Sequence, residues 1–343
     1  MDREEESIKM FPYQTIHEIE NRDIPDFLQE FIHVKEFQRL KDVGMSCGLE
    51  YTSFPFFQDQ FRYTRYDHSI GVALLLSRFT EDKNIIIAGL YHDIATPCFA
   101  HVVDFLNQDY ETQESTESLT GKIIHESDEI SSLLDKYGMQ EENINDYHKY
   151  PLADNDRPKL SADRLEYNLG NAVQYHNLSF AQLEGIVKDL VVLENEEKEK
   201  EIGFENLDEA LLFTSCSLFN SGVYTQAEDR YSMERLALIL KDAIQRVVIR
   251  YEDLYLNESF LISKLLKDEI SADGFNRFEG LSRMRVSKEK KDGYLKIKAK
   301  KRYVNPLVKN RGRVLDLSKE LRQRTDAFLR EDFEEYLCGN DVF

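Results

Sequence analysis

The chain has 343 residues, 41% of them hydrophobic and 31% charged, which is enough apolar material for a folded protein with an ample core. No apolar stretch approaches the ~20 residues that span a bilayer. The acidic N-terminus lacks the basic start and apolar core of a secretory signal, so we expect a cytoplasmic protein. Four widely spaced cysteines argue against a disulfide framework or a thiolate zinc site. The net charge of -20 disfavours general nucleic-acid binding.

Apolar residues recur at helical spacing through the first two-thirds of the chain. A turn-rich break at 154–158 precedes one of these helical segments. The run of charged residues at 194–201 is predicted to be an exposed helix or loop without a chemical role. The predicted helices cover residues 27–40, 68–79, 84–91, 118–134, 164–174, 209–220 and 235–255.

The pattern changes after residue 280. Apolar and basic residues alternate over 294–300, which is typical of a half-buried strand, and 302–308 is a second candidate strand that Pro306 interrupts. A helix is predicted over 316–329. The predicted fold class is therefore mainly α, with a helical body over residues 1–270 and a small, basic α+β appendage over residues 271–343.

The positive charges are concentrated in the predicted appendage. Residues 283–313 contain 13 Lys and Arg against two acidic residues, a local balance of +11 that leaves -31 on the rest of the chain. The stretch fits either a solvated surface or a docking site for a polyanion, such as a regulatory nucleotide or an acidic patch on a second subunit. We predict a self-association or effector surface that is separate from the active site, and expect a homo-oligomer, with a dimer favoured.

Two short segments combine histidine and aspartate beside apolar runs. Residues 65–68 read Arg-Tyr-Asp-His, and residues 91–94 read Tyr-His-Asp-Ile. A lone histidine on an apolar helix is most often a core residue. Burying two imidazoles and a carboxylate, however, is costly unless they are paired or bind a metal. Imidazole and carboxylate ligands suit a divalent ion such as Mn, Fe, Co, Ni, Zn or Mg, so these segments predict a metal site.

The ordered set of motifs resembles the HD-domain phosphohydrolases, and most closely their deoxynucleoside triphosphate triphosphohydrolase branch. The adjacent His-Asp pair that names the family is weak evidence alone, whereas the ordered set is specific. The resemblance covers roughly residues 36–171 and rests on segments 37–40, 54–55, 65–71, 89–93 and 99–101. It implies a helical HD domain with a divalent metal held by His68, His92, Asp93 and Asp163. For Asp163 a structural alternative is that it caps a helix.

The resemblance also implies roles around the metal. His101 would protonate the leaving oxygen, and Asp104, three residues further on, would orient the imidazole of His101. His125 would lie near the phosphates. The implied substrate contacts are two phosphate-binding cations and two residues at the sugar, namely Arg65, Arg164, Tyr167 and Asn171. The remaining histidines are interpreted as surface or packing residues: His17, His33, His148 and His176.

The sequence thus predicts a metal-dependent phosphohydrolase whose partner is a nucleotide, with removal of triphosphate from a dNTP as the nearest precedent. Two alternatives remain open: a phosphomonoesterase for a nucleoside monophosphate or another small phosphorylated metabolite, and a nucleotide-binding regulatory protein. Three departures bear on the substrate. Asn171 stands where the family commonly has a sugar-binding aspartate. Thr96 stands where the family has a phosphate-contacting histidine, and Ser46-Cys47-Gly48 replaces the Gln-Leu-Gly that inspects the sugar. The match therefore covers the catalytic core and not the residues that read deoxyribose.

Overall fold

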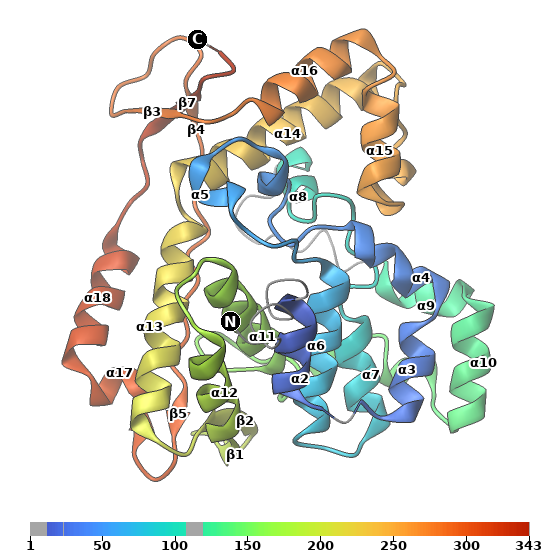
Figure 1. The fold of residues 1–343 in the computed structure, drawn as a ribbon, viewed down its shortest axis with the longest axis vertical. Helices are drawn as coiled ribbons and strands as arrows, with labels where there is room; N and C mark the ends of the chain where they lie inside the picture. The colour runs from blue at the N-terminus through green and yellow to red at the C-terminus, as the bar shows by residue number, and fades with distance from the viewer. Residues whose placement is uncertain (1–11, 23, 108–118, 343) are drawn as a thin grey trace, which may run out of the picture.

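The computed structural model describes residues 12–22, 24–107 and 119–342, which are mainly helical, as predicted (Figure 1). The buried side chains form two hydrophobic cores, one in the lower and one in the upper part of the view in Figure 1. Among the described residues, no helix is both long and apolar enough to cross a membrane.

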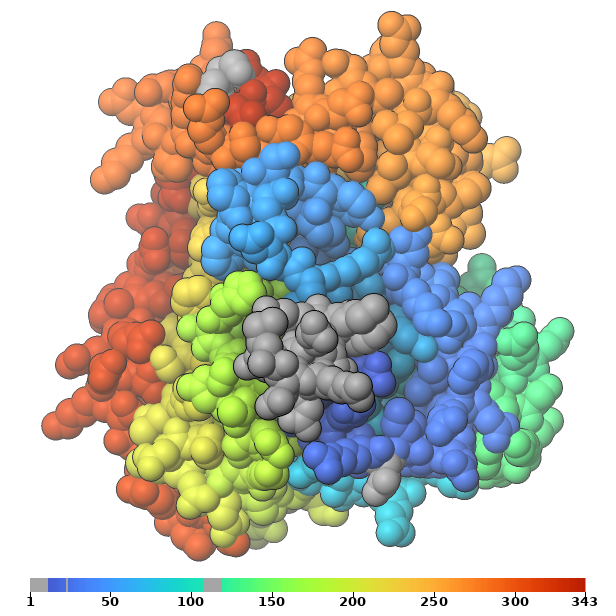
Figure 2. Space-filling model, viewed as in Figure 1, coloured from blue at the N-terminus to red at the C-terminus, as the bar shows by residue number. Residues whose placement is uncertain are grey.

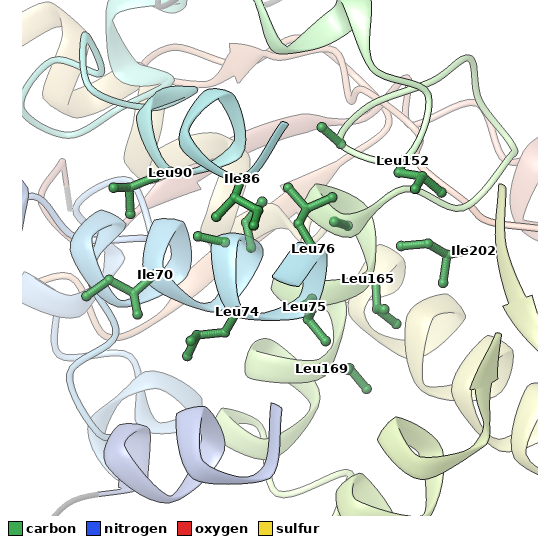
Figure 3. Packing of buried hydrophobic residues seen from close by; sticks show 14 of the residues in the cluster. Ile70, Leu74, Leu75, Leu76, Ile86, Leu90, Leu152, Leu165, Leu169 and Ile202 are labelled. Atoms are coloured by element: carbon green, nitrogen blue, oxygen red, sulfur yellow. The ribbon is translucent and has the colours of Figure 1, made fainter. Parts of the chain in front are cut away.

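The first core surrounds α6 (Arg65–Ser77), which packs against α7 (Lys83–Tyr91), α11 (Ala162–Gln174) and α2 (Pro12–Glu20). Figure 3 shows apolar side chains of α6, α7 and α11 meeting in this core. Because α6 is covered on most sides, its sequence is apolar nearly all round. The helices that complete this part are α3 (Asp26–Ile32), α4 (Lys35–Gln38), α9 (Thr120–Glu126), α10 (Asp128–Tyr137), α12 (Phe180–Asp189) and α13 (Leu207–Val223).

The second core surrounds α14 (Ala227–Gln245), which packs against α8 (Val102–Leu106) and α16 (Glu269–Glu279). Two further helices lie in this part, α5 (Pro55–Gln58) and α15 (Glu258–Leu265). A three-stranded sheet of order β3-β7-β4 borders it. Its central strand β7 (Tyr336–Gly339) is antiparallel to both β3 (Met284–Ser287) and β4 (Leu295–Lys296).

The C-terminal part of the chain joins both cores. A four-stranded sheet has the order β1-β2-β5-β6, in which β5 (Leu307–Val308) pairs in parallel with β2 (Lys200–Phe204). The flanking strands are β1 (Leu190–Glu194) and β6 (Gly312–Arg313), and α17 (Val314–Leu317) and α18 (Lys319–Arg330) pack on α13. In Figure 2 this orange-to-red segment runs along one side of the molecule. Residues of the predicted appendage therefore contribute to both cores.

The charge run at 194–201, predicted to be an exposed helix or loop, forms the turn of the antiparallel β1–β2 hairpin, whose apolar ends pair at Leu190 and Phe204. Two local predictions need correction. The helix predicted over 118–134 begins outside the described residues, and Ser127 divides its described part into α9 and α10 by capping α10. The two strands predicted over 294–308 shrink to the two-residue strands β4 and β5.

Candidate active site

The first turn of α6 positions two site residues. Thr64 Oγ1 accepts a hydrogen bond from the Asp67 amide at 3.3 Å, and Asp67 Oδ2 accepts one from the Thr64 amide at 3.1 Å, which makes a capping box. This fixed turn places Arg65 and His68, three residues apart, on one face of the helix. Thr64 is therefore the N-cap of α6, and Asp67 completes the capping box.

Three predicted metal ligands converge. His68, His92 and Asp163 each offer an atom within 4.8 Å of the others, and His68 Nε2 lies 3.1 Å from both His92 Nε2 and Asp163 Oδ1. His92 ends α7, and its Nδ1 lies 2.7 Å from the Gly89 carbonyl oxygen, which turns Nε2 towards the cluster. Asp163 lies in the first turn of α11, but Ser161 caps that helix. Asp163 is thus not needed as the cap, which was its structural alternative.

The electrostatics of the cluster suit a cation. Burial alone would lower the pKa of His68, but Glu166 and Asp163 raise it to about 10. Burial would raise the pKa of Asp163, but the hydrogen bond with His68 and the charge of His92 lower it to about 2. The surrounding groups thus favour positive charge where nitrogen and oxygen donors meet. A divalent ion would supply that charge with the imidazoles neutral.

Asp93 borders the cluster and also holds Arg65. Its Oδ2 lies 3.5 Å from His92 Nε2, 3.9 Å from His68 Nε2 and 2.7 Å from Nη1 of Arg65. Thr96 Oγ1 donates to its other oxygen at 2.7 Å. Burial opposes ionisation of Asp93, but Arg65 and the two imidazoles lower its pKa below the ordinary value. Thr96, where the sequence departs from the family pattern, therefore supports the aspartate of the pair.

Glu166 is a site residue that the sequence analysis missed. It is fully buried one turn after Asp163, and its Oε2 makes a short hydrogen bond with His68 Nδ1. The hydroxyls of Tyr13 and Tyr63 donate to it at 2.9 Å and 2.6 Å. Helices α6 and α11 approach closely here, since a Cβ at Gly71 would lie 2.7 Å from the Glu166 side chain. A carboxylate on the far nitrogen of a ligating histidine fixes its tautomer and raises its basicity.

We expect the Glu166→Gln variant to bind a divalent metal roughly 10–100-fold more weakly, the usual effect of losing such a partner of a ligating histidine. Calorimetric titration with Mn²⁺ measures the change. The Tyr13→Phe variant is the matched control, because it removes one hydrogen bond to Glu166 and keeps the carboxylate, and its affinity should change much less. Equal affinities of wild type and Glu166→Gln would show that Glu166 has only a packing role.

The cluster lies in a cavity of about 720 Å³ lined by residues from both cores. His101 lines this cavity, and its Nδ1 lies 2.8 Å from Oδ2 of the fully buried Asp104. A tight turn delivers His101 to the cavity, because Phe99 and Ala100 both have left-handed backbone angles, with φ of 60° and 45°. The buried Glu258 secures the turn by accepting the Phe99 amide at 3.1 Å. His101 and Asp104 thus form an oriented pair suited to proton transfer.

Comparison with known proteins agrees with this geometry. The family model of the HD domain matches residues 65–154. A metal-dependent phosphohydrolase, cns2 of Cordyceps militaris, is 26% identical over 48% of this chain and 45% of its own length. A deoxynucleoside triphosphate triphosphohydrolase SAMHD1 homolog of Dictyostelium discoideum is 22% identical over 62% of this chain and 43% of its own length. The chain therefore contains an HD domain, and it is similar to metal-dependent phosphohydrolases.

Two further comparisons cover more of the HD-domain chain. Uncharacterized protein YdhJ of Bacillus subtilis is 29% identical over 67% of this chain and 68% of its own length. The crystal structure of a hypothetical protein from Aquifex aeolicus matches with a TM-score of 0.62 and 20% identity over 93% of both chains, which extends the shared fold beyond the HD domain. The matched HD domain contains the His92–Asp93 pair and ends before Asp163, so Asp163 joins the site through its position in the structure.

The predicted substrate contacts all line the cavity: Arg65, Arg164, Tyr167 and Asn171. The guanidinium of Arg164 is nevertheless committed to the adjacent loop. It pairs with Asp154 at 2.9 Å, donates from Nε to the Lys159 carbonyl at 2.9 Å, and makes short hydrogen bonds with Asn155. Arg164 therefore braces the cavity wall, and Arg65 is the cation beside the cluster.

One wall of the cavity is aromatic. Tyr167, Tyr175 and Tyr224 line it, and the rings of Tyr167 and Tyr224 lie edge to face with centroids 6.4 Å apart. Asn171 donates a hydrogen bond to the Tyr224 hydroxyl at 2.6 Å. This wall offers ring faces and polar atoms to a flat or hydroxylated part of a ligand.

Two histidines lie elsewhere than predicted. The side chain of His125 is 75% exposed and pairs with Glu141 at 3.1 Å, and it is not among the residues lining the cavity. His148, which the sequence analysis interpreted as a surface or packing residue, does line the cavity, with Nε2 3.4 Å from Asp154 Oδ2. Its neighbour Tyr147 packs its ring 5.0 Å from the ring of His92. The structure therefore brings His148, and not His125, to the site.

The basic stretch reaches the cavity, which contradicts the prediction that it is separate from the active site. Residues 297–304, which we call the strap, run in extended form from β4 towards β5 (Figure 1). Lys298, Lys300 and Arg302 of the strap line the same cavity as the metal cluster. The basic stretch is distant in sequence from the metal-binding motifs. It reaches the cavity because the chain returns to the first core, where β5 pairs with β2.

Proposed function

We propose that this protein hydrolyses a nucleotide, with a deoxynucleoside triphosphate as the leading substrate and inorganic triphosphate as the product. The observation that carries the proposal is that one cavity holds the His68–His92–Asp163 cluster, the His101–Asp104 pair and an aromatic wall. The Dictyostelium relative, whose name states this activity, supports the choice of substrate.

In the proposed reaction, His68, His92, Asp93 and Asp163 hold a divalent ion. That ion would supply positive charge at a phosphoryl group and lower the pKa of water. Arg65, aligned by its 2.7 Å ion pair with Asp93, neutralises charge on the phosphoryl oxygens.

The remaining groups handle the proton and the nucleoside. His101 turns Nδ1 to Asp104, so Nε2 is the nitrogen that transfers a proton to the leaving oxygen. Asp104 is a positioning residue. Tyr167, Tyr224 and Asn171 hold the sugar and base. His125 has no part in the proposal, because its side chain is exposed and bonded to Glu141.

The test is a panel of nucleotides offered to the purified protein with Mn²⁺, Co²⁺, Ni²⁺ or Mg²⁺. The panel contains dNTPs, NTPs, nucleoside monophosphates and sugar phosphates, and ³¹P NMR identifies the product. Release of triphosphate from a dNTP would support the proposal. Phosphate released only from monophosphates would replace it with a phosphomonoesterase. Tight nucleotide binding without turnover under every metal would favour a regulatory protein instead.

A further inference from the structure

Most side chains of the strap reach the cavity. Lys298, Ala299, Lys300 and Arg302 line it. Ile297 is instead buried in the second core, and Lys301 donates from Nζ to the carbonyl oxygens of Leu329, at 2.6 Å, and Glu331 at the end of α18. Three of the four basic side chains of the strap are thus at the cavity.

A buried arginine fixes the strap in this place. Arg230 is 2% exposed, and its Nη1 donates to the Ile297 carbonyl at 2.6 Å and to the Phe333 carbonyl at 3.5 Å. Its Nη2 pairs with Glu335 and its Nε donates to the Thr225 carbonyl at 3.0 Å. The strap is therefore anchored to α14 at its start and to α18 through Lys301. A preorganised wall of this kind loses little freedom when a ligand binds.

Both cations and acids line the cavity. Arg65, Arg164 and Arg230 each form an ion pair, with Asp93, Asp154 and Glu335 respectively. Arg302 also lines the cavity, close enough to Arg157 and Asp229 to affect both. Burial lowers the pKa of Arg157 and the charge of Arg302 lowers it further, while the same charge opposes the rise that burial causes in the pKa of Asp229. A bound anion would reduce the repulsion between the two guanidinium groups.

Arg302 also lies close to the residues of the proposed reaction. Burial lowers the pKa of His101 and the charge of Arg302 adds to that effect, while the same charge opposes the rise that burial causes in the pKa of Tyr167 and Tyr224. All three residues line the cavity with Arg302. Arg302 therefore lies in the same part of the cavity as the proton donor and the aromatic wall.

We propose that Lys298, Lys300 and Arg302 form a cationic wall that binds the phosphate groups of the substrate beyond the one held beside Arg65. The inference rests on the proposed function for its substrate, and it assigns to the strap the selection of polyphosphate over single phosphate. Guanidinium and ammonium groups both make strong, charge-assisted bonds to phosphate oxygens, and Arg can do so through two parallel bonds.

The experiment measures binding of inorganic tripolyphosphate and of orthophosphate by calorimetry, without added metal. The variants are Lys298→Gln/Lys300→Gln and Arg302→Gln. The control is Lys288→Gln/Lys290→Gln, which removes the same charge as the double variant from exposed positions outside the cavity lining. We expect each strap variant to bind tripolyphosphate about tenfold or more weakly, as expected for lost hydrogen bonds between charged groups, with orthophosphate binding changed by less. The control should match the wild type.

Three outcomes would overturn the inference: unchanged tripolyphosphate affinity in both strap variants, equal losses for both anions, or no tripolyphosphate binding by the wild type. Because the readout is binding of an inorganic anion, it does not depend on turnover. A protein that binds tripolyphosphate through the strap but hydrolyses no nucleotide would remove the proposed function and keep the cationic wall. If the protein releases triphosphate from dNTPs but the strap variants bind tripolyphosphate as the wild type does, the proposed function stands and the cationic wall is removed.

Discussion

The Asp163→Ala variant is expected to lose its divalent ion and, with it, turnover by a factor on the order of 10³ or more. Asp163 is the one carboxylate whose oxygen lies 3.1 Å from His68 Nε2 and 3.7 Å from His92 Nε2. A metal contributes several kcal/mol of charge stabilisation to phosphoryl transfer, and each ~1.4 kcal/mol corresponds to a factor of ten in rate. Elemental analysis of the purified variant and its rate with an active nucleotide measure the two losses together.

The control for this variant is Asp273→Ala on α16, because Asp273 is an exposed aspartate outside the cavity lining that pairs with Arg277, one turn away. It should keep both metal and activity. Full metal occupancy in the Asp163→Ala protein would contradict the proposed ligand set, whatever its rate. A folded variant that loses metal but keeps its rate would contradict the metal-dependent reaction.

Replacing His101 by glutamine is expected to leave the metal in place and lower kcat by roughly 10²–10⁴, the usual share of general acid catalysis. Glutamine can still hydrogen-bond to Asp104, whose Oδ2 lies 2.8 Å from His101 Nδ1, so the buried carboxylate keeps a partner. Steady-state kinetics and elemental analysis test the two parts. The matched control is His33→Gln, an exposed histidine outside the cavity lining. Loss of metal from the His101 variant would make His101 a ligand and not the donor.

The pH dependence of kcat/KM distinguishes an acid from a base at this position. Burial lowers the pKa of His101 below its ordinary value of 6.5. The protonated form therefore prevails only below that lowered pKa. If His101 donates the proton, kcat/KM should fall as the pH rises through the pKa, and this limb should be absent in His101→Gln. A rate that instead rises through the same region would assign His101 as a base.

Local signals explain why much of the fold and the metal cluster could be predicted. Helices α6, α7 and α11 carry apolar runs with capping residues at their starts, and these features lie within each segment. The three residues of the cluster come from the ends of those helices. The helical setting of His68 and of the His92–Asp93 pair therefore indicated a metal site, and the resemblance to the HD-domain phosphohydrolases added Asp163.

Glu166 and His148 could not be found in this way, because their roles depend on distant partners. Glu166 looks like an ordinary helical glutamate until Tyr13 and Tyr63, from two separate segments, are seen to donate to it. One signal was available: Glu166 follows Asp163 by three residues and so shares its helical face. His148 lies among polar residues in a short turn, a setting that gives no hint of its position at the cavity.

The position of the strap at the cavity also depends on distant residues. The alternation of apolar and basic residues correctly indicates an extended chain, but no local pattern says which way the basic side faces. That direction is set by Arg230, which lies far upstream and grips the Ile297 carbonyl, and by the end of α18 downstream. Because the rest of the chain carries net negative charge, the basic stretch was predicted to be a docking surface.

The parallel pairing of β2 with β5 bears on how the site is acquired during synthesis. Each group of the metal cluster, together with Glu166 and its tyrosine partners, lies upstream of β2, whereas the strap is made only after α16. The strap is therefore the last part of the cavity wall to be synthesised. The first core likewise takes buried residues from β5, α17 and α18, so a nascent chain completes both the cavity and this core only with its C-terminal part.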